Sequence, residues 1–132
     1  MTKVLVIGAQ SIDIFANTKE EYHFRDSNTA KIQMAFGGVG RNIAENLCRL
    51  GHDVYFISVF GDDHFSQTAQ KSLDEMGIHI SDSLFMKNQK SSVYLGVLDS
   101  DNDLLLGLSD MEIIDQLNTE FLKKKHSFIE SF

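Results

Sequence analysis

The stretch Phe36–Leu47 reads FGGVGRNIAENL, and three of its residues between positions 37 and 40 are glycines. Apolar side chains then recur at three- and four-residue spacing, which is typical of a helix with one buried face. They are Ile43, Ala44, Leu47, Cys48 and Leu50. Gly51 follows, where a helix commonly ends. The stretch therefore predicts a glycine turn that opens a helix, and such a turn lets backbone approach a ligand because glycine has no Cβ.

The common nucleotide-binding motifs do not fit these glycines, and a simple tight turn is the alternative. A dinucleotide-binding turn needs a third glycine where this chain has Ile43, and a P-loop needs Gly-Lys-Ser/Thr, which the chain lacks. Asn42 carries an amide donor and acceptor beside the neutral glycines, which favours an uncharged, polyhydroxylated ligand. Arg41 could meet a phosphate, but we expect it on the solvent face of the helix.

The sequence GGVGRNIA at positions 37–44, followed by Gly51 and Gly61, resembles the N-terminal signature of the ribokinase/PfkB family of carbohydrate and nucleoside kinases. The longer run GGVGRNIAENLCRLG, together with Ser109–Met111, is most similar to the pseudouridine kinase branch. The resemblance implies a ribokinase-like α/β fold, with a parallel-sheet core, flanking helices and a small β lid. The lid strands are expected at about 12–36 and 91–109. Residues 1–132 would then be the N-terminal portion of the kinase domain, with the C-terminal half absent.

Composition is that of an ordinary globular protein, with 132 residues, 42% hydrophobic and 23% charged. The net charge of −7 argues against general nucleic-acid binding, which depends on Lys and Arg. No apolar run approaches the roughly 20 residues of a membrane span. A single cysteine, Cys48, excludes an internal disulfide and is expected to be buried, and the five histidines lack zinc-ligand spacing. We therefore expect a cytoplasmic protein that binds neither nucleic acid, membrane nor structural metal.

Apolar patterns predict the remaining elements. Buried strands are expected at 3–7 and 53–60, an alternating half-exposed strand at 29–36, and a hairpin of strands 91–98 and 104–108. A helix is expected at 65–76, capped by Asp62 or Asp63, and a final helix is expected to be capped by Thr119. Strand–helix–strand order favours a parallel sheet.

The hairpin turn at 99–103 (DSDND) carries three alternate aspartates, as calcium loops do. A calcium loop also needs glycine at its sixth position and glutamate at its twelfth, where this chain has Leu104 and Asp110. A solvated hairpin tip is therefore preferred.

Asp13 lies just past the end of the first strand, and ligands of α/β sheets bind beyond the carboxyl ends of strands. A loop aspartate is often only a turn or cap residue. An ionised carboxylate is also a pure acceptor, well suited to a diol. The resemblance implies that Asp13 binds sugar hydroxyls with the neighbouring polar residues and the glycines. The expected substrate-binding residues are Ser11, Asp13, Gly37, Gly38, Asn42 and Asp110, with residues 27–31 as further lid candidates.

The resemblance implies an ATP-dependent kinase that phosphorylates the primary hydroxyl of a sugar or nucleoside, with the 5′-hydroxyl of pseudouridine as the first expectation. The alternatives are a ribokinase, a fructokinase, a purine-nucleoside kinase or a non-catalytic sugar-binding remnant. The family's catalytic aspartate lies in a Gly-Ala-Gly-Asp turn that this chain lacks. We therefore expect ATP, Mg²⁺ and a possible monovalent cation to bind mainly in the absent half, and the isolated chain to be inactive. A homodimer through the lid is also expected, since a small sheet leaves an apolar face.

Overall fold

Two parallel strands form the centre of the structure, a computed structural model that describes residues 1–132. They are β1 (Lys3–Ile7) and β4 (Asp53–Ile57), paired in register from Lys3 opposite Asp53 to Ile7 opposite Ile57. Helix α1 (Val39–Arg49) precedes β4 in the chain and packs on both central strands. Short strands β5 (Val59–Phe60) and β6 (Leu84–Phe85) pair in parallel beyond them.

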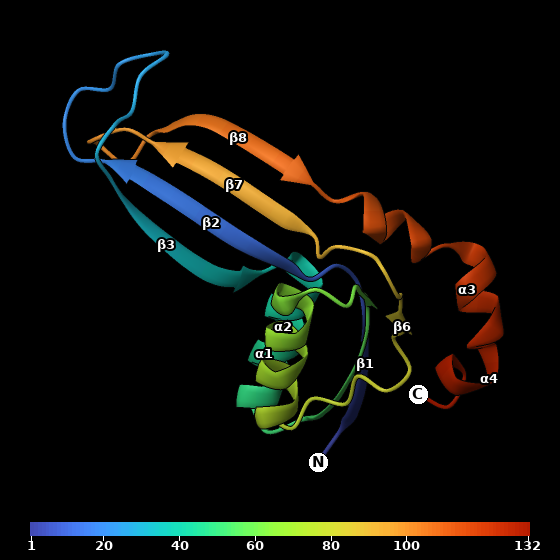
Figure 1. Cartoon of the computed structure of the whole chain (residues 1–132). Coiled ribbons are helices and arrows are strands. Elements are labelled where there is room, and N and C mark those ends of the chain that lie inside the picture. Colours follow the sequence, from blue (N-terminus) through green and yellow to red (C-terminus); the bar gives the residue numbers. More distant parts are fainter.

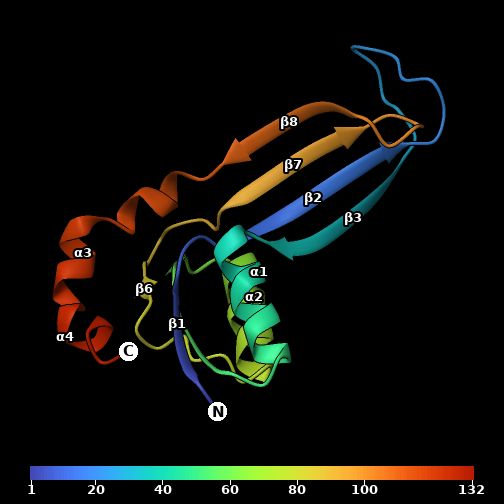
Figure 2. The same cartoon turned by 180° about the vertical axis from the view of Figure 1, so that it is seen from behind.

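Helices cover both faces of the central strands, as Figures 1 and 2 show. On one face lie α1 and α2 (His64–Glu75), and their apolar side chains join those of the strands in one core. Its buried members are Ile12, Ala44, Val54, Phe56, Phe60, Ala69, Leu73 and Ile78. On the other face, Phe128 and Phe132 pack against the ring of Tyr55. They belong to the C-terminal segment, which contains η1 (Glu112–Gln116), α3 (Thr119–Lys124) and α4 (His126–Ile129).

A separate four-stranded sheet, which we call the second sheet, extends away from the helices (Figure 1). Its order is β3 (Ala30–Gly37), β2 (Ser11–Thr18), β7 (Val93–Leu98) and β8 (Leu104–Asp110). The central pair β2–β7 is parallel, and the outer pairs are antiparallel. The β7–β8 hairpin has the five-residue connection 99–103 that the aspartate cluster predicted. None of the helices has both the length and the apolar character needed to cross a membrane.

The two faces of this sheet differ in character. One face is apolar and open: the exposed fractions are 66% for Ile32, 56% for Met34, 52% for Leu106 and 51% for Leu108. The opposite face carries the alternate residues of each strand, among them Ser11, Asp13, Phe15 and Tyr94. We call this second face the polar face of the sheet.

Several predicted boundaries are wrong. Asp13 lies inside β2 rather than in a loop, because Ser11 onward pairs with both β3 and β7. The strand expected at 53–60 is interrupted at Ser58, which receives a backbone hydrogen bond from Leu84. The last helix is divided at Lys125, and Asn118 rather than Thr119 caps its first half, since the Asn118 side chain accepts from Phe121 N. Cys48 is partly rather than fully buried.

Asp63 joins helix α2 to the beginning of the second sheet. Its Oδ1 accepts hydrogen bonds from the Ser66 amide at 2.9 Å and the Ser91 hydroxyl at 2.6 Å. Its Oδ2 accepts from the Ser91 amide at 2.9 Å. Burial acts to raise the pKa of the Asp63 carboxyl, but the hydrogen bonds from Ser91 and Ser66 outweigh it, so the pKa is lowered. The ionised carboxylate is therefore a stabilising tie between the two parts of the fold.

We expect Asp63→Asn to lower the free energy of unfolding by about 1–3 kcal/mol near neutral pH, because bonds to a charged acceptor are lost. A lowered folded-state pKa means that this stabilisation is present above the ordinary value of 3.8 and is lost as the pH falls through the folded value. The gap between wild type and variant should therefore close in acid. Urea unfolding across this pH range measures it. Asp74→Asn is the matched control, since Asp74 is an exposed residue of the same helix. Equal losses of unfolding free energy in the two variants would contradict the stabilising role of the Asp63 carboxylate.

Candidate functional site

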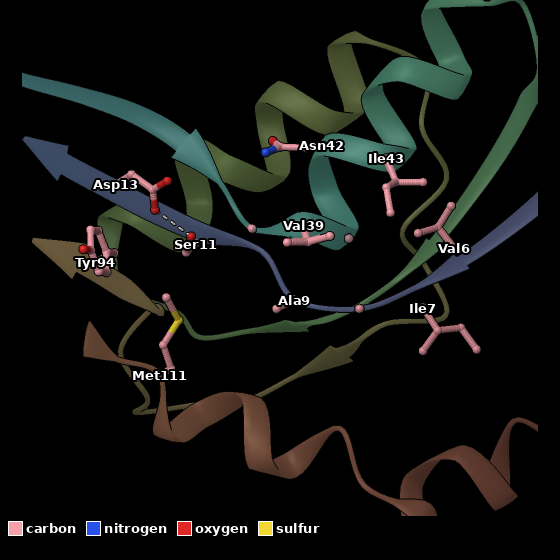
Figure 3. A pocket seen from close by; sticks show the side chains of 13 residues that line it. Val6, Ile7, Ala9, Ser11, Asp13, Val39, Asn42, Ile43, Tyr94 and Met111 are labelled. Atoms are coloured by element: carbon pink, nitrogen blue, oxygen red, sulfur yellow. Dashed lines mark hydrogen bonds between the residues drawn. The ribbon is translucent and has the colours of Figure 1, made fainter. Parts of the chain in front are cut away.

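A cavity of about 610 Å³ lies where the central strands meet the second sheet. Figure 3 shows it from close by, between the end of β1, the beginning of β2 and the first turn of α1. Thirteen residues line it: Val6, Ile7, Gly8, Ala9, Ser11, Asp13, Gly38, Val39, Gly40, Asn42, Ile43, Tyr94 and Met111. Its volume is within the usual range for a small-molecule site.

Asp13 projects into the cavity from the polar face of the sheet. The Ser11 hydroxyl donates a hydrogen bond of 2.8 Å to its Oδ1, which fixes the carboxylate. Gly37 lies opposite Ser11 on β3, and a Cβ added to Gly37 would overlap the Asp13 carboxylate. Gly37 therefore contributes by leaving room for that carboxylate rather than by lining the cavity.

The glycine turn packs main chain directly against main chain. Gly38 has φ +93°, and a Cβ there would lie 2.5 Å from the carbonyl oxygen of Ala9. A Cβ on Gly40 would lie 2.8 Å from the Cα of Gly8. The Arg41 amide also donates to the Ala9 oxygen at 3.1 Å. These contacts hold the first turn of α1 against the segment between β1 and β2.

Asn42 lines the same cavity from the first turn of α1. In Figure 3 its amide extends from the helix toward the side on which Asp13 lies. An acceptor-only carboxylate and an amide with both donor and acceptor thus border one cavity, which three glycines also line. This arrangement suits a neutral molecule with several hydroxyl groups.

Arg41 does not lie on the helix surface, as the sequence suggested, nor in the cavity. It is only 4% exposed and forms a 2.7 Å ion pair with Glu45, a 3.1 Å bond to the Ser72 hydroxyl and a contact over the Phe36 ring. Hydrogen bonding from Arg49 and then from Arg41 lowers the pKa of Glu45 despite some burial. Arg41 therefore ties α1 to α2 through Ser72, whereas the Arg-x-x-x-Glu spacing signals only its ion pair with Glu45 within α1.

Asp110 and residues 27–31 are not among the residues that line the cavity. Asp110 is the exposed last residue of β8, opposite Val93, whereas the next residue, Met111, does line the cavity. Residues 27–31 lie near the far end of the sheet (Figure 1). Sequence reasoning missed Tyr94, whose position depends on strand register, and Met111, which belongs to the Ser109–Met111 run but was not assigned to the site.

The described residues do not fit a Mg²⁺–nucleotide site. No group of three or more His, Cys, Asp or Glu side chains is placed to hold a metal ion. Asp13 on β2 lines the same cavity as the glycine turn, and its negative charge would repel phosphate. No step through ATP is therefore assigned to the residues that line this cavity.

Comparisons with known proteins identify the family of the chain. The model of the pfkB family of carbohydrate kinases matches residues 1–132. The pseudouridine kinase of Escherichia coli K12 is 33% identical over 127 residues, which are 96% of this chain and 41% of that protein. The guanosine-inosine kinase of Exiguobacterium acetylicum is 30% identical over 109 residues, 83% of this chain and 36% of that protein.

Solved structures show the same fold. A carbohydrate kinase from Agrobacterium tumefaciens superposes with a TM-score of 0.84 at 28% identity, over 93% of this chain and 40% of that one. The architecture is the ribokinase-like α/β fold. The chain spans about 41% of the length of the pseudouridine kinase that it matches. Because the family model matches all of residues 1–132, this chain belongs to the pfkB family of carbohydrate kinases.

Proposed function

We propose that this chain supplies the sugar site of an ATP-dependent kinase that phosphorylates the primary hydroxyl of a nucleoside, with pseudouridine as the first candidate. One observation carries the proposal: Asp13 and Asn42 border a single cavity that Gly8, Gly38 and Gly40 also line. The relatives named for pseudouridine kinase and guanosine-inosine kinase support a nucleoside. A cytoplasmic location, where ATP is plentiful, is part of the proposal.

In this proposal the chain's own residues bind and orient the sugar. Asp13, fixed by Ser11, accepts hydrogen bonds from two neighbouring hydroxyls, and the Asn42 amide binds a third group across the cavity. Holding the sugar in one orientation places its primary hydroxyl for reaction, and positioning accounts for much of the catalysis of phosphoryl transfer. ATP, Mg²⁺, a monovalent cation and the catalytic base would be held by residues outside this chain. The second sheet would act as a lid that excludes water.

The complete gene product, incubated with ATP and each of pseudouridine, uridine, inosine, ribose and fructose, tests the proposal. Mass spectrometry of the products should show a nucleoside 5′-phosphate. Preference for ribose or fructose would favour the ribokinase or fructokinase alternative. Sugar binding without phosphorylation of any compound would favour a non-catalytic sugar-binding protein. The 132 residues alone should show no turnover, since they lack the Gly-Ala-Gly-Asp turn.

We also propose that the apolar face of the second sheet pairs two copies of the protein. Ile32, Met34, Leu106 and Leu108 are each more than half exposed there, and such a continuous apolar surface favours association. The double variant Leu106→Lys/Leu108→Lys should shift the complete protein from dimer to monomer in sedimentation velocity, because buried charges would lack partners. Leu50→Lys, at a leucine after α1 that is 75% exposed, is the control. A wild-type protein that sediments as a monomer would contradict the pairing.

A further inference from the structure

Two aromatic rings lie beside Asp13 on the polar face of the second sheet. Tyr94 on β7 is the direct cross-strand partner of Asp13 on β2. Phe15, two residues further along β2, is on the same face. The rings of Phe15 and Tyr94 are 5.9 Å apart between centroids and inclined at 56°. The Asp13 carboxylate is thus flanked by an aromatic surface on the same face of the sheet.

Glycines opposite these rings allow them to lie against the sheet. Gly96 and Gly107 are cross-strand partners on β7 and β8. A Cβ on Gly96 would lie 2.7 Å from the Phe15 ring, and a Cβ on Gly107 would overlap the Tyr94 hydroxyl. Each ring therefore leans across the neighbouring strand into space that a side chain would otherwise fill. We call Phe15, Tyr94, Gly96 and Gly107 the aromatic platform.

Of the platform residues, Tyr94 lines the cavity, and it lies at an end that differs chemically from the other. Tyr94 lines the cavity together with Asp13, and neighbouring strands are only about 4.8 Å apart. Figure 3 shows Val6, Ile7 and Ile43, which are aliphatic, at the opposite end. A sugar bound by Asp13 would therefore have one side facing an aromatic ring. Aromatic faces favour planar partners, and nucleobases stack on them regardless of base identity.

We infer that Tyr94, supported by Phe15, is the stacking surface for the base of a nucleoside and selects nucleosides over free sugars. The inference rests on the proposed function, since it places the base relative to a sugar bound at Asp13. Tyr94 is the specificity-determining residue. Gly96 and Gly107 are positioning residues, because their lack of a Cβ leaves room for the two rings against the sheet. Free ribose would bind the same carboxylate without the contribution of the platform.

Kinetics of the complete gene product test the assignment, with pseudouridine, uridine, inosine and ribose as substrates. Tyr94→Leu should lower kcat/KM for the preferred nucleoside by roughly 5- to 150-fold, the effect of losing one stacked base. Its effect on ribose should be less than about twofold, because ribose has no base to stack. Tyr94→Phe keeps the ring and should restore nucleoside selectivity. Phe24→Leu is the control, since Phe24 is an 86% exposed aromatic residue away from the platform.

Gly107→Ala provides a second variant that leaves the Tyr94 side chain intact. The added methyl group would displace the ring, and the nucleoside-to-ribose ratio of kcat/KM should fall in the same direction as in Tyr94→Leu. Thermal melting of each variant identifies any loss of folding. Equal losses of kcat/KM for nucleoside and ribose would overturn the platform and leave the kinase proposal intact. A wild-type protein with the same kcat/KM for ribose as for nucleosides would do the same.

A binding measurement separates this inference from the proposed function. Saturation-transfer NMR should show transfer from the protein to the base protons of the bound nucleoside, and Tyr94→Leu should reduce it selectively relative to the ribose protons. Selective transfer to the base protons would support the platform even if no compound were phosphorylated. The lack of phosphorylation would then refute only the kinase proposal. Transfer to the ribose protons only, or the absence of any binding, would overturn the platform.

Discussion

Replacing Asp13 with asparagine is expected to lower kcat/KM of the complete protein for its sugar or nucleoside by about 100-fold. The variant keeps the size of the side chain, so the cavity and the contact with Gly37 are retained. It removes the negative charge and replaces one acceptor oxygen by an amide donor, which cannot accept a hydroxyl hydrogen bond. The Ser11 hydroxyl, 2.8 Å from Oδ1, would still be able to donate to the remaining oxygen. The loss should therefore appear in substrate binding and orientation and leave stability nearly unchanged.

Steady-state kinetics and thermal melting together check this expectation. Asp101→Asn is the matched control, because it makes the same chemical change at the exposed hairpin tip. Asp110→Asn is a further comparison that tests the sequence-based assignment of Asp110, which lies outside the lining of the cavity. If Asp13→Asn retained the activity of Asp101→Asn, Asp13 would not be a sugar ligand.

Gly38→Ala is expected to destabilise the fold by about 3 kcal/mol. A non-glycine residue forced into such a rare backbone conformation costs about 1–3 kcal/mol, and overpacking costs a similar amount. Both apply at Gly38, where φ is +93° and the new methyl group would lie 2.5 Å from the carbonyl oxygen of Ala9. Because that oxygen belongs to main chain, it cannot move away as a flexible side chain would.

Gly51→Ala separates these two contributions, which makes it a matched control. Gly51 also has a positive φ, of +87°, but no atom lies within 4 Å of the position that its Cβ would take. It should therefore cost only about 1 kcal/mol, from the backbone conformation alone. Urea unfolding of both variants measures the difference. Equal losses would show that the contact between Gly38 and Ala9 does not constrain the fold.

Local signals in the sequence were sufficient for much of the fold. Gly51 and Gly77, both with positive φ, follow α1 and α2 as expected of helix ends, and Asp63 caps α2. The aspartate-rich segment 99–103 connects β7 and β8 as expected. These features depend on residues that are near one another in the chain, so their spacing is visible without coordinates. The family assignment likewise came from one glycine-rich stretch with fixed spacing, and the family model confirms it.

Features that depend on distant residues could not be predicted. Asp13 belongs to a strand because β3 and β7 flank it, and nothing near it in the sequence shows those partners. Tyr94 lies beside Asp13 only because β2 and β7 pair in this register. Arg41 is buried because Ser72 and Phe36 enclose it from other elements. The ligand role of Asp13 and Asn42 stays a prediction that the kinetic experiments address.

The contact between Gly8 and Gly40 has a consequence for how substrate preference can change over time. Because this wall of the cavity is built from main chain, point mutations have little means of reshaping it without disturbing the fold. The second sheet is different, since residues such as Ser11 and Tyr94 line the cavity through their side chains. Natural divergence and laboratory evolution should therefore leave the part of the ligand that contacts this wall fixed and alter the part that faces the second sheet, with new specificities arising at side chains such as Tyr94.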